Sequence, residues 1–360
     1  MSSPEARHPV YFDLFRRMER DIVEGKYKKG DLLPSDIDLA KQFDVSRYVA
    51  REVYSELVRR HLVTRVRRKG TQVTYDRETA RVRKIGLILL ADVPSYYLFE
   101  KGVEEVLGKR GAGLYVQYSY DDEKLNAKAL EEALAHDVEG LIISPPPQSS
   151  FEPYKQLIAR GFPVVLALAS NPGVTCVFPD DYKAGRLVGE HFGQAGIKRP
   201  AVVTQAERQY AQERLYGFRE GIARHGLHVD DDRIIPAKYF DEQGRYQPDI
   251  GRKETLALLA MKPRPDAVFA VNDLIATSIY FWLLNLGVRV PQDVAVAGVD
   301  TLGSRFHPFP LTSVDIGLEE MGRKSAELLL QQLQSTHAPI VQKKVEPRLV
   351  IGASTAKKRR

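Results

Sequence analysis

Cysteine is almost missing from this sequence, which contains one, Cys176, in 360 residues. A single cysteine excludes an internal disulfide bond and any zinc site built from several thiolates. It is also typical of a protein that works in a reducing compartment. We expect Cys176 to be a small buried side chain rather than a reactive thiol.

Long hydrophobic runs are missing as well. The longest, IGLILLA at residues 85–91, is far shorter than the roughly 20 residues that a membrane-spanning helix needs. The start, MSSPEARHPVYFDLF, contains no apolar stretch of signal-peptide length. With 43% hydrophobic residues, the chain is long enough to form two or three packed domains. We therefore expect a soluble, globular, cytoplasmic protein that does not interact with membranes.

The sequence also lacks the motifs of several common enzyme classes. The sequence has no G-x-x-x-x-G-K-[ST] phosphate loop, no H-E-x-x-H zinc motif and no G-x-S-x-G nucleophile motif. GKRGAG, at residues 108–113, lies at the end of an expected helix, where it cannot act as a dinucleotide fingerprint. The histidines are scattered, and Gly226 separates His225 from His228. We predict no catalytic residue, no metal site and no cofactor.

Positive charge is concentrated at the two ends of the chain. Residues 1–84 hold 20 Lys and Arg side chains against 13 Asp and Glu, a net charge of +7. The tail KKRR, residues 357–360, adds +4, whereas residues 85–356 carry −5. A basic N-terminal region on a mildly acidic body indicates a polyanion as its partner, although such a charge also aids solubility. We interpret the tail as a solvated terminus.

Three short helices and a hairpin are predicted in the basic region. Residues 11–25 and 35–43 have helical apolar periodicity, and Ser35 with Asp38 forms a capping box at the start of the second helix. The third helix follows the turn DVS, and its valine stripe leaves Arg and Tyr side chains on the other face. Residues 62–75 then alternate as two strands around RRKG.

This order of elements has the geometry of a winged helix-turn-helix. The second helix of such a pair lies in the major groove and presents its first turns to base edges. A cationic hairpin beside it can follow the phosphate backbone or enter the minor groove. The basic region is therefore predicted to bind double-stranded DNA.

Residues 9–75 resemble the winged helix of GntR-type regulators, through the pattern LPSD…LA…VSR…R at this spacing. The resemblance implies that Ser46, Arg47 and Arg51 contact phosphates and base edges. It also implies that Gly70 and its neighbours form the wing tip. The candidate DNA-contacting residues are Ser35, Ser46, Arg47, Tyr48, Arg51, Arg67, Arg68, Lys69, Gly70 and Thr71.

Two departures from the GntR pattern limit what can be transferred from it. Ile37 stands where the family often has a basic residue, and Arg68 replaces the first wing glycine. The operator sequence and the wing geometry of relatives therefore do not carry over to this chain.

From Lys84 onward, short apolar runs alternate with helical patterns, as in KIGLILLAD, FEKGVEEVLGKRG and LYVQYSY. This alternation predicts parallel sheets with helices on both faces. A second set of such elements begins at RPAVVTQ, near residue 199, and repeats the order of the first. Two doubly wound lobes leave a cleft at the carboxyl ends of their strands, where a small ligand would bind.

Residues 84–334 resemble the sugar-responsive domain of the LacI/GalR regulators, which is related to periplasmic sugar-binding proteins. The resemblance rests on DDYKAGRLVGEHF, QERLYGFREGIARHGL, RPDAVFAVNDLIATSIYFWLLNLGVRVPQDVAVAGVD and FPLTSVDIGLEEMGRKSAELLLQQL. It implies an effector site made by Ser95, Tyr96, Ser144, Asp180, Arg214, Phe240, Asn272 and Asp300. Carboxylates, an amide and a guanidinium suit sugar hydroxyls, and an aromatic face suits the C–H side of a sugar ring.

Each candidate effector residue also has a purely structural interpretation. Asn272 and Asp300 suit helix caps, Phe240 suits the core, and Arg214 suits a surface ion pair. Purines also bind this fold, so a carbohydrate effector follows from the resemblance and not from the residues.

The expected fold class is therefore α/β, with an N-terminal winged helix-turn-helix and a two-lobed, doubly wound domain like periplasmic binding proteins. We expect a DNA-binding domain at residues 1–75, a charged linker at 76–84, an effector and dimerisation domain at 85–350, and a basic tail at 351–360. The predicted function is a homodimeric transcription repressor that a small carbohydrate controls. A ligand-dependent activator or co-repressor-type regulator remains open, as does a cytoplasmic sugar-binding protein or enzyme without DNA function.

Overall fold

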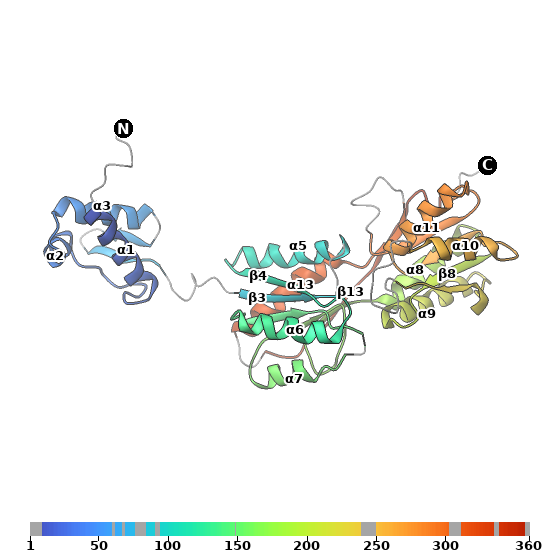
Figure 1. Cartoon of the computed structure of the whole chain (residues 1–360), viewed down its shortest axis with the longest axis horizontal. Coiled ribbons are helices and arrows are strands. Elements are labelled where there is room, and N and C mark those ends of the chain that lie inside the picture. Colours follow the sequence, from blue (N-terminus) through green and yellow to red (C-terminus); the bar gives the residue numbers. More distant parts are fainter. Residues whose placement is uncertain are drawn as a thin grey trace. The chain divides into compact units, whose positions relative to one another are not determined.

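The computed structural model describes residues 9–59, 62–66, 69–75, 84–90, 94–147, 149–238, 250–301, 311–334 and 338–356. The chain separates into two compact units, Met1–Arg83 and Lys84–Arg360 (Figure 1). Among the helices in these ranges, none is both long and apolar enough to cross a membrane.

The first unit is a winged helix-turn-helix. Its elements are α1 (Pro9–Val23), α2 (Asp36–Gln42), α3 (Arg47–Arg59), β1 (Val63–Val66) and β2 (Gly70–Val73). The apolar faces predicted from the sequence meet in one core around Met18, Ile22, Leu39 and Leu57. Strands β1 and β2 pair antiparallel, as the alternation around RRKG predicts. The predicted helix-turn-helix and its hairpin are therefore confirmed.

The N-terminal lobe of the second unit contains a six-stranded sheet in the order β13-β7-β6-β5-β3-β4. The strands are β3 (Lys84–Leu89), β4 (Gly113–Tyr118), β5 (Gly140–Ile143), β6 (Val164–Ala167), β7 (Cys176–Pro179) and β13 (Gln342–Val345). The helices are α5 (Pro94–Gly108), α6 (Glu123–Ala135), α7 (Glu152–Ala159) and α13 (Leu318–Gln334). Helices α5 and α13 pack together on one face, and α6 and α7 cover the other (Figure 1).

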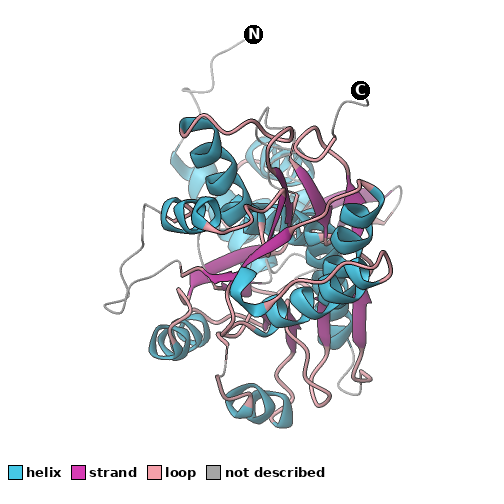
Figure 2. Cartoon of the chain, turned by 90° about the vertical axis from the view of Figure 1, so that its right-hand side faces the viewer, coloured by secondary structure: helices cyan, strands magenta, loops and turns pink. Residues whose placement is uncertain are grey.

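The C-terminal lobe repeats this plan with the strand order β14-β12-β11-β10-β8-β9. Its strands are β8 (Pro200–Thr204), β9 (Ile234–Pro236), β10 (Ala267–Ala270), β11 (Ala295–Val299), β12 (Thr312–Asp315) and β14 (Arg348–Val350). Its helices are α8 (Asp181–Gln194), α9 (Gln209–Ala223), α10 (Arg252–Ala260) and α11 (Asp273–Asn285). In Figure 2 the strands of the second unit lie between helices. The predicted pair of doubly wound lobes is confirmed.

Three chain segments cross between the lobes. They connect β7 to α8, β12 to α13, and β13 to β14. Ion pairs tie these segments together: Lys344 Nζ lies 3.4 Å from Asp180 Oδ2, and Arg348 Nη2 lies 3.0 Å from Asp315 Oδ2. The crossings therefore form a hinge region that both lobes share.

The end of the chain corrects one boundary. Residues 351–360 were expected to form a basic tail, but Ser354 and Thr355 are buried against the C-terminal lobe. The Ser354 hydroxyl donates to Val296 O and accepts from Thr312 N, so this segment continues the lobe instead of leaving it. The KKRR residues themselves lie outside the described ranges.

Candidate functional site

The candidate DNA-binding face lies on α3 of the first unit. Arg47, Tyr48 and Arg51 are exposed in its first two turns, and 73% of Tyr48 is accessible to solvent. Ser46 precedes the helix, and its hydroxyl accepts a hydrogen bond from Val49 N at 3.3 Å. The first turns of α3 therefore present two guanidinium groups and a phenol on one open surface, as the sequence predicts.

An aspartate orients two arginines of this face. Asp36 Oδ2 accepts from Arg51 Nε at 3.1 Å, and its Oδ1 accepts from Arg65 Nη1 at 3.0 Å. Burial raises the pKa of Asp36, but hydrogen bonds from Arg65 and Arg51 outweigh burial and lower it. Asp36 and Arg65 were not predicted as functional residues. No local pattern in the sequence indicates that a carboxylate of α2 pairs with Arg65 of β1, because the two residues are 29 positions apart.

The wing candidates divide into three groups. Lys69 and Gly70 are exposed at the hairpin, and Gly70 has a left-handed φ of +113°, which glycine adopts without strain. Thr71 is 2% exposed, so its side chain belongs to the core and not to the DNA-facing surface. Arg67 and Arg68 lie outside the described residues.

Ser35 acts as a helix cap. Its hydroxyl accepts from Asp38 N at 3.2 Å and donates to Asp38 Oδ2 at 2.5 Å. The bond from Asp38 N is one half of the predicted capping box, and both bonds occupy the hydroxyl.

The candidate effector site of the second unit is centred on Arg214, from α9. Its side chain is only 4% exposed. Its Nε donates to Asp181 Oδ1 at 2.7 Å, and Nη1 donates to Val271 O at 2.6 Å. Its Nη2 lies 3.4 Å from Asp300 Oδ1. Burial lowers the pKa of Arg214, but Asp181 and Asp300 outweigh burial and raise it, so the guanidinium stays charged.

A close helix crossing positions this ion pair. Helices α8 and α9 meet through glycines: a Cβ on Gly185 would lie 1.8 Å from Arg214 O, and one on Gly217 would lie 1.8 Å from Tyr182 O. Only glycine permits backbones to approach so closely. The crossing therefore brings Asp181, at the first turn of α8, against the Arg214 side chain.

Tyr210, one turn before Arg214 on α9, connects Arg214 to polar side chains that follow β8 and β10. The Tyr210 ring lies beneath the Arg214 guanidinium, at 4.8 Å from centroid to carbon. Gln205 Oε1 accepts from Tyr210 OH at 2.5 Å and from Asn272 Nδ2 at 3.3 Å. Burial raises the pKa of Tyr210 to about 12, so its hydroxyl keeps its proton and donates. The network holds each amide and hydroxyl in a fixed orientation.

Asp300 occupies an unusual environment directly after β11. Its φ is +109°, a left-handed value that costs energy for a side chain other than glycine and that is typical of functional sites. Burial raises its pKa to about 6; Arg214 acts in the opposite direction, and Asp181 adds to the rise. Asp300 is therefore a carboxylate that changes its charge close to neutral pH.

The N-terminal lobe contributes to the same region. Tyr96, in the first turn of α5, interacts electrostatically with Asp121 of its own lobe and with Tyr210, Asp300 and Arg208 of the other. Its pKa is raised, first by burial and then by these carboxylates. Ser144 is buried directly after β5. The site is thus built from both lobes at the carboxyl ends of their strands.

The structure brings together four of the eight predicted effector residues: Tyr96, Arg214, Asn272 and Asp300. Asp180 is not one of these four residues. Its carboxylate caps α8, where it accepts a hydrogen bond from Lys183 N at 2.9 Å. The described part of the chain does not include Phe240 or the side chain of Ser95.

Sequence reasoning missed several residues of this network. They are Asp121, Asp181, Gln205, Arg208 and Tyr210. Gln205 directly follows the apolar strand PAVVT, so its position at a carboxyl strand end was a readable signal. Asn272 also caps α11, where its Oδ1 accepts from Ile275 N at 3.1 Å, so the predicted binding and capping roles coexist.

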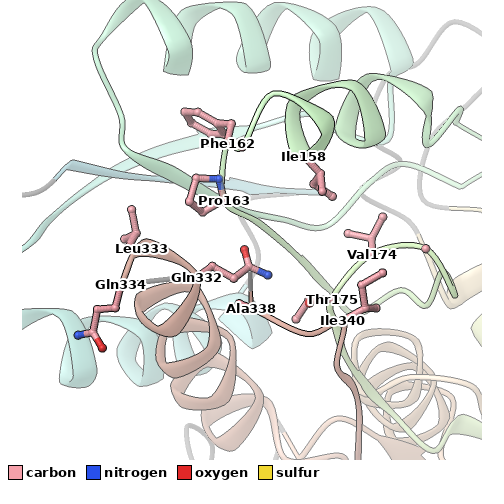
Figure 3. A pocket seen from close by; sticks show the side chains of 12 residues that line it. Ile158, Phe162, Pro163, Val174, Thr175, Gln332, Leu333, Gln334, Ala338 and Ile340 are labelled. Atoms are coloured by element: carbon pink, nitrogen blue, oxygen red, sulfur yellow. The ribbon is translucent and has the colours of Figure 1, made fainter. Parts of the chain in front are cut away.

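A pocket with a different character lies at the opposite edge of the N-terminal lobe (Figure 3). Ile158, Phe162, Val174, Leu333 and Ile340 contribute to its lining. These residues precede β6, β7 and β13 or end α7 and α13. Its lining combines these apolar side chains with the polar side chains of Thr175, Gln332 and Gln334, and it includes no charged side chain among the described residues.

Comparisons with known proteins agree with this architecture. Residues 11–73 match the family model of bacterial regulatory proteins of the gntR family, and residues 190–355 match that of the periplasmic binding protein-like domain. An arabinose metabolism transcriptional repressor from Geobacillus stearothermophilus is 26% identical over 336 residues, which cover 91% of this chain and 92% of that protein.

Two further relatives extend the comparison. The ribose operon repressor of Escherichia coli strain K12 is 27% identical over 257 residues, which cover 69% of this chain and 75% of that protein. The solved structure of a transcriptional regulator, CelR, in complex with cellobiose has a TM-score of 0.66 at 22% identity. That alignment covers 97% of this chain and 100% of the other, and it shows that the fold is shared.

Proposed function

We propose that this chain, in which a gntR-family DNA-binding domain is joined to a periplasmic binding protein-like domain, is a transcription repressor controlled by a small carbohydrate. The observation that carries the proposal is the buried network around Arg214, in which two carboxylates, an amide and tyrosines from both lobes converge. The named relatives are repressors of arabinose metabolism and of a ribose operon, which supports a sugar as the effector.

The chemistry of the network suits a polyhydroxyl ligand. Asp181 and Asp300 can accept hydrogen bonds from sugar hydroxyl groups, and Arg214 and Asn272 can donate hydrogen bonds to hydroxyl oxygens. The Tyr210 ring offers an apolar face to the ring of the sugar. Because most of these groups already hold one another in place, little side-chain freedom is lost when a ligand binds. The lobes close on the sugar, and the closure changes the affinity for operator DNA.

The DNA end of the mechanism uses α3. Arg47, Tyr48 and Arg51 are placed to enter the major groove, and the hairpin with Lys69 lies along the backbone. We propose that two copies bind the two halves of a near-palindrome and associate through the second unit. The domain limits proposed are 1–75 for DNA binding, 76–84 for the linker and the remainder for sensing and association, in a cytoplasmic protein without enzymatic activity.

Calorimetric titration with arabinose, ribose and cellobiose, followed by gel-shift assays on the DNA upstream of the gene, tests the proposal. We expect one sugar to bind and to release the DNA. Arg47→Ala should weaken DNA binding and leave sugar affinity intact, whereas Arg214→Ala should do the reverse.

Three outcomes would contradict parts of this scheme. A sugar that strengthens DNA retention would make the protein a co-repressor-type regulator. No retarded band at low salt would remove the DNA function altogether and favour a sugar-binding protein of another kind. Unchanged sugar affinity in Arg214→Ala would show that the effector site is assigned wrongly.

A further inference from the structure

One ion pair joins the two lobes directly across the candidate effector site. Arg208 Nη2 lies 2.5 Å from Asp121 Oδ2, and the two side chains are 15% and 20% exposed. Asp121 follows β4 of the N-terminal lobe, and Arg208 precedes α9 of the C-terminal lobe. Because the pair is partly buried, the attraction between its charges is screened less than in a surface ion pair.

The backbone on the Asp121 side is held in one conformation. Tyr120 and Asp121 have φ values of +48° and +61°, and Asp122 N donates to Ser119 O to close the turn. Asp122 then caps α6, since its Oδ1 accepts from Lys124 N and Leu125 N. Aspartate is among the few residues that adopt a left-handed conformation at modest cost. The turn therefore aims the Asp121 carboxylate at Arg208.

The second oxygen of this carboxylate has no partner. Asp121 Oδ1 is buried and has no hydrogen-bond donor within reach among the residues that the structure describes. Burying a carboxylate oxygen without a hydrogen-bond donor costs free energy. A ligand that donates a hydrogen bond to this oxygen would remove that cost. Tyr210 interacts electrostatically with Arg208, but its hydroxyl already donates to Gln205. A ligand hydroxyl is the kind of donor that this position lacks.

We propose that Asp121 and Arg208 form an effector-completed clasp, in which one carboxylate oxygen holds the opposite lobe and the other accepts a hydroxyl of the bound sugar. The proposal rests on the proposed function and adds two residues to it. Asp121 would determine specificity, because only a ligand with a hydroxyl at this position satisfies Oδ1. Asp121 would also couple sugar binding to closure of the two lobes. Its carboxylate belongs to the N-terminal lobe and would bind both the sugar and Arg208 of the C-terminal lobe.

The clasp is tested first without any sugar. Cysteines introduced at Lys128 on α6 and Lys253 on α10 place one spin label on each lobe, and the buried Cys176 does not compete for the label. We expect Asp121→Asn and Arg208→Gln each to shift the label separation to longer distances. The double variant should shift it no further than the single variants, because both remove the same pair.

The matched control is Arg219→Gln. It removes an arginine–aspartate pair, with Asp231, that lies within the C-terminal lobe, and it should leave the label separation unchanged. If Asp121→Asn and Arg208→Gln behave like this control, there is no clasp and the proposal is wrong.

The second measurement uses the sugar that binds best among arabinose, ribose and cellobiose. Asp121→Asn should weaken its binding by about tenfold or more, whereas Arg219→Gln should not. Unchanged affinity in Asp121→Asn, beside lost affinity in Arg214→Ala, would overturn the clasp and leave the proposed function standing. If the unaltered protein binds none of the three sugars, the proposed effector class fails, and the label separation alone then decides whether the clasp exists.

Discussion

At the scale of single residues, the candidate effector site contains charged side chains whose burial costs free energy. Arg214 is charged because Asp181 and Asp300 compensate it, and removing either carboxylate would leave a buried charge only partly compensated. Asp300 is the most sensitive member, because its pKa of about 6 lies close to physiological pH. The groups that face it are Arg214, Asp181, Tyr96 and Tyr210.

We predict that sugar affinity decreases as the pH falls from about 7 to about 5. Protonated Asp300 is a weaker hydrogen-bond acceptor for a sugar hydroxyl, and it no longer compensates the positive charge of Arg214. Calorimetric titration across this range measures the effect. Asp300→Asn should bind more weakly and lose most of the pH dependence. A variant that kept the same pH dependence would assign the titration to another group.

The stability of the fold should respond to Asp300 in the opposite direction. Its folded-state pKa is raised above the unfolded value, so the folded protein binds this proton more tightly. The contribution of Asp300 to the free energy of unfolding is therefore largest below about pH 4 and is lost as the pH rises through about 6. Comparing the unfolding of the unaltered chain with Asp300→Asn separates this effect from the loss of binding.

Asp36 gives a residue-scale prediction for the DNA-binding unit. Asp36→Ala removes the carboxylate that orients Arg51 and Arg65. We expect operator affinity to fall by about tenfold, because two arginines lose their preorganisation. Competition with nonspecific DNA should show that specificity falls more than general affinity. Lys26→Ala, which breaks a surface pair with Asp21 away from α3, is the control, and an equal loss there would contradict the prediction.

The assignment of single residues to the candidate effector site was the least precise part of the sequence prediction. The resemblance carried by DDYKAGRLVGEHF implied an effector contact for Asp180, but Asp180 and its neighbour Asp181 have different partners. Asp180 caps α8, and Asp181 binds Arg214. Successive residues at a helix start point in directions about 100° apart, so an uncertainty of one residue in the helix boundary exchanges the two roles.

At the scale of elements, each lobe is organised around one close helix pair. In the C-terminal lobe α8 and α9 cross at Gly185 and Gly217, and in the N-terminal lobe α5 and α13 cross at Gly102 and Gly322. In each pair, a Cβ on these glycines would lie 2.1 Å or less from a backbone oxygen of the other helix. The crossings leave no room for side chains, and the first of them fixes the distance from Asp181 to Arg214.

We predict that Gly217→Ala destabilises the second unit by about 3 kcal/mol, because the new Cβ would lie 1.8 Å from Tyr182 O and force α8 and α9 apart. Denaturant unfolding measures the loss. Sugar affinity should fall too, since Asp181 moves away from Arg214. In Gly108→Ala, at the end of α5, the new Cβ meets no atom within 4 Å, so unfolding should change by less than about 1 kcal/mol. Equal behaviour of the two variants would contradict the role of the crossing.

Most elements could be predicted from the sequence because their periodicity is local. The alternation of apolar runs and helical patterns sufficed for β3 to α7 and for β8 to α11. The elements at the end of the chain, which pack back against earlier parts of the fold, could not be placed from local periodicity. Helix α13 and strand β13 follow the C-terminal lobe in sequence but pack in the N-terminal lobe, and β14 pairs antiparallel with β12. These placements depend on contacts between residues far apart in the chain, which periodicity does not encode.

At the scale of the whole molecule, the proposed mechanism needs two copies. Helix α11 and its C-terminal end expose several large apolar side chains. Phe281 and Leu284 are 54% and 46% exposed, and Leu286 follows at the helix end with 46% exposed. Exposed apolar residues gathered on one helix are typical of an association surface. They lie outside the site around Arg214, so association and sugar binding can be separated by mutation.

We predict that Leu284→Asp converts the proposed dimer into a monomer in sedimentation experiments, because it places a charge among the exposed apolar residues of α11. Operator affinity should then fall steeply, since one copy binds a half-site without the contribution of its partner. Sugar affinity should stay the same, because Leu284 does not touch the effector site. Leu125→Asp introduces the same charge at a similarly exposed leucine on α6 and should leave the dimer intact. If Leu284→Asp remains a dimer, association uses another face, and the spacing of the operator half-sites must then be set by that other interface.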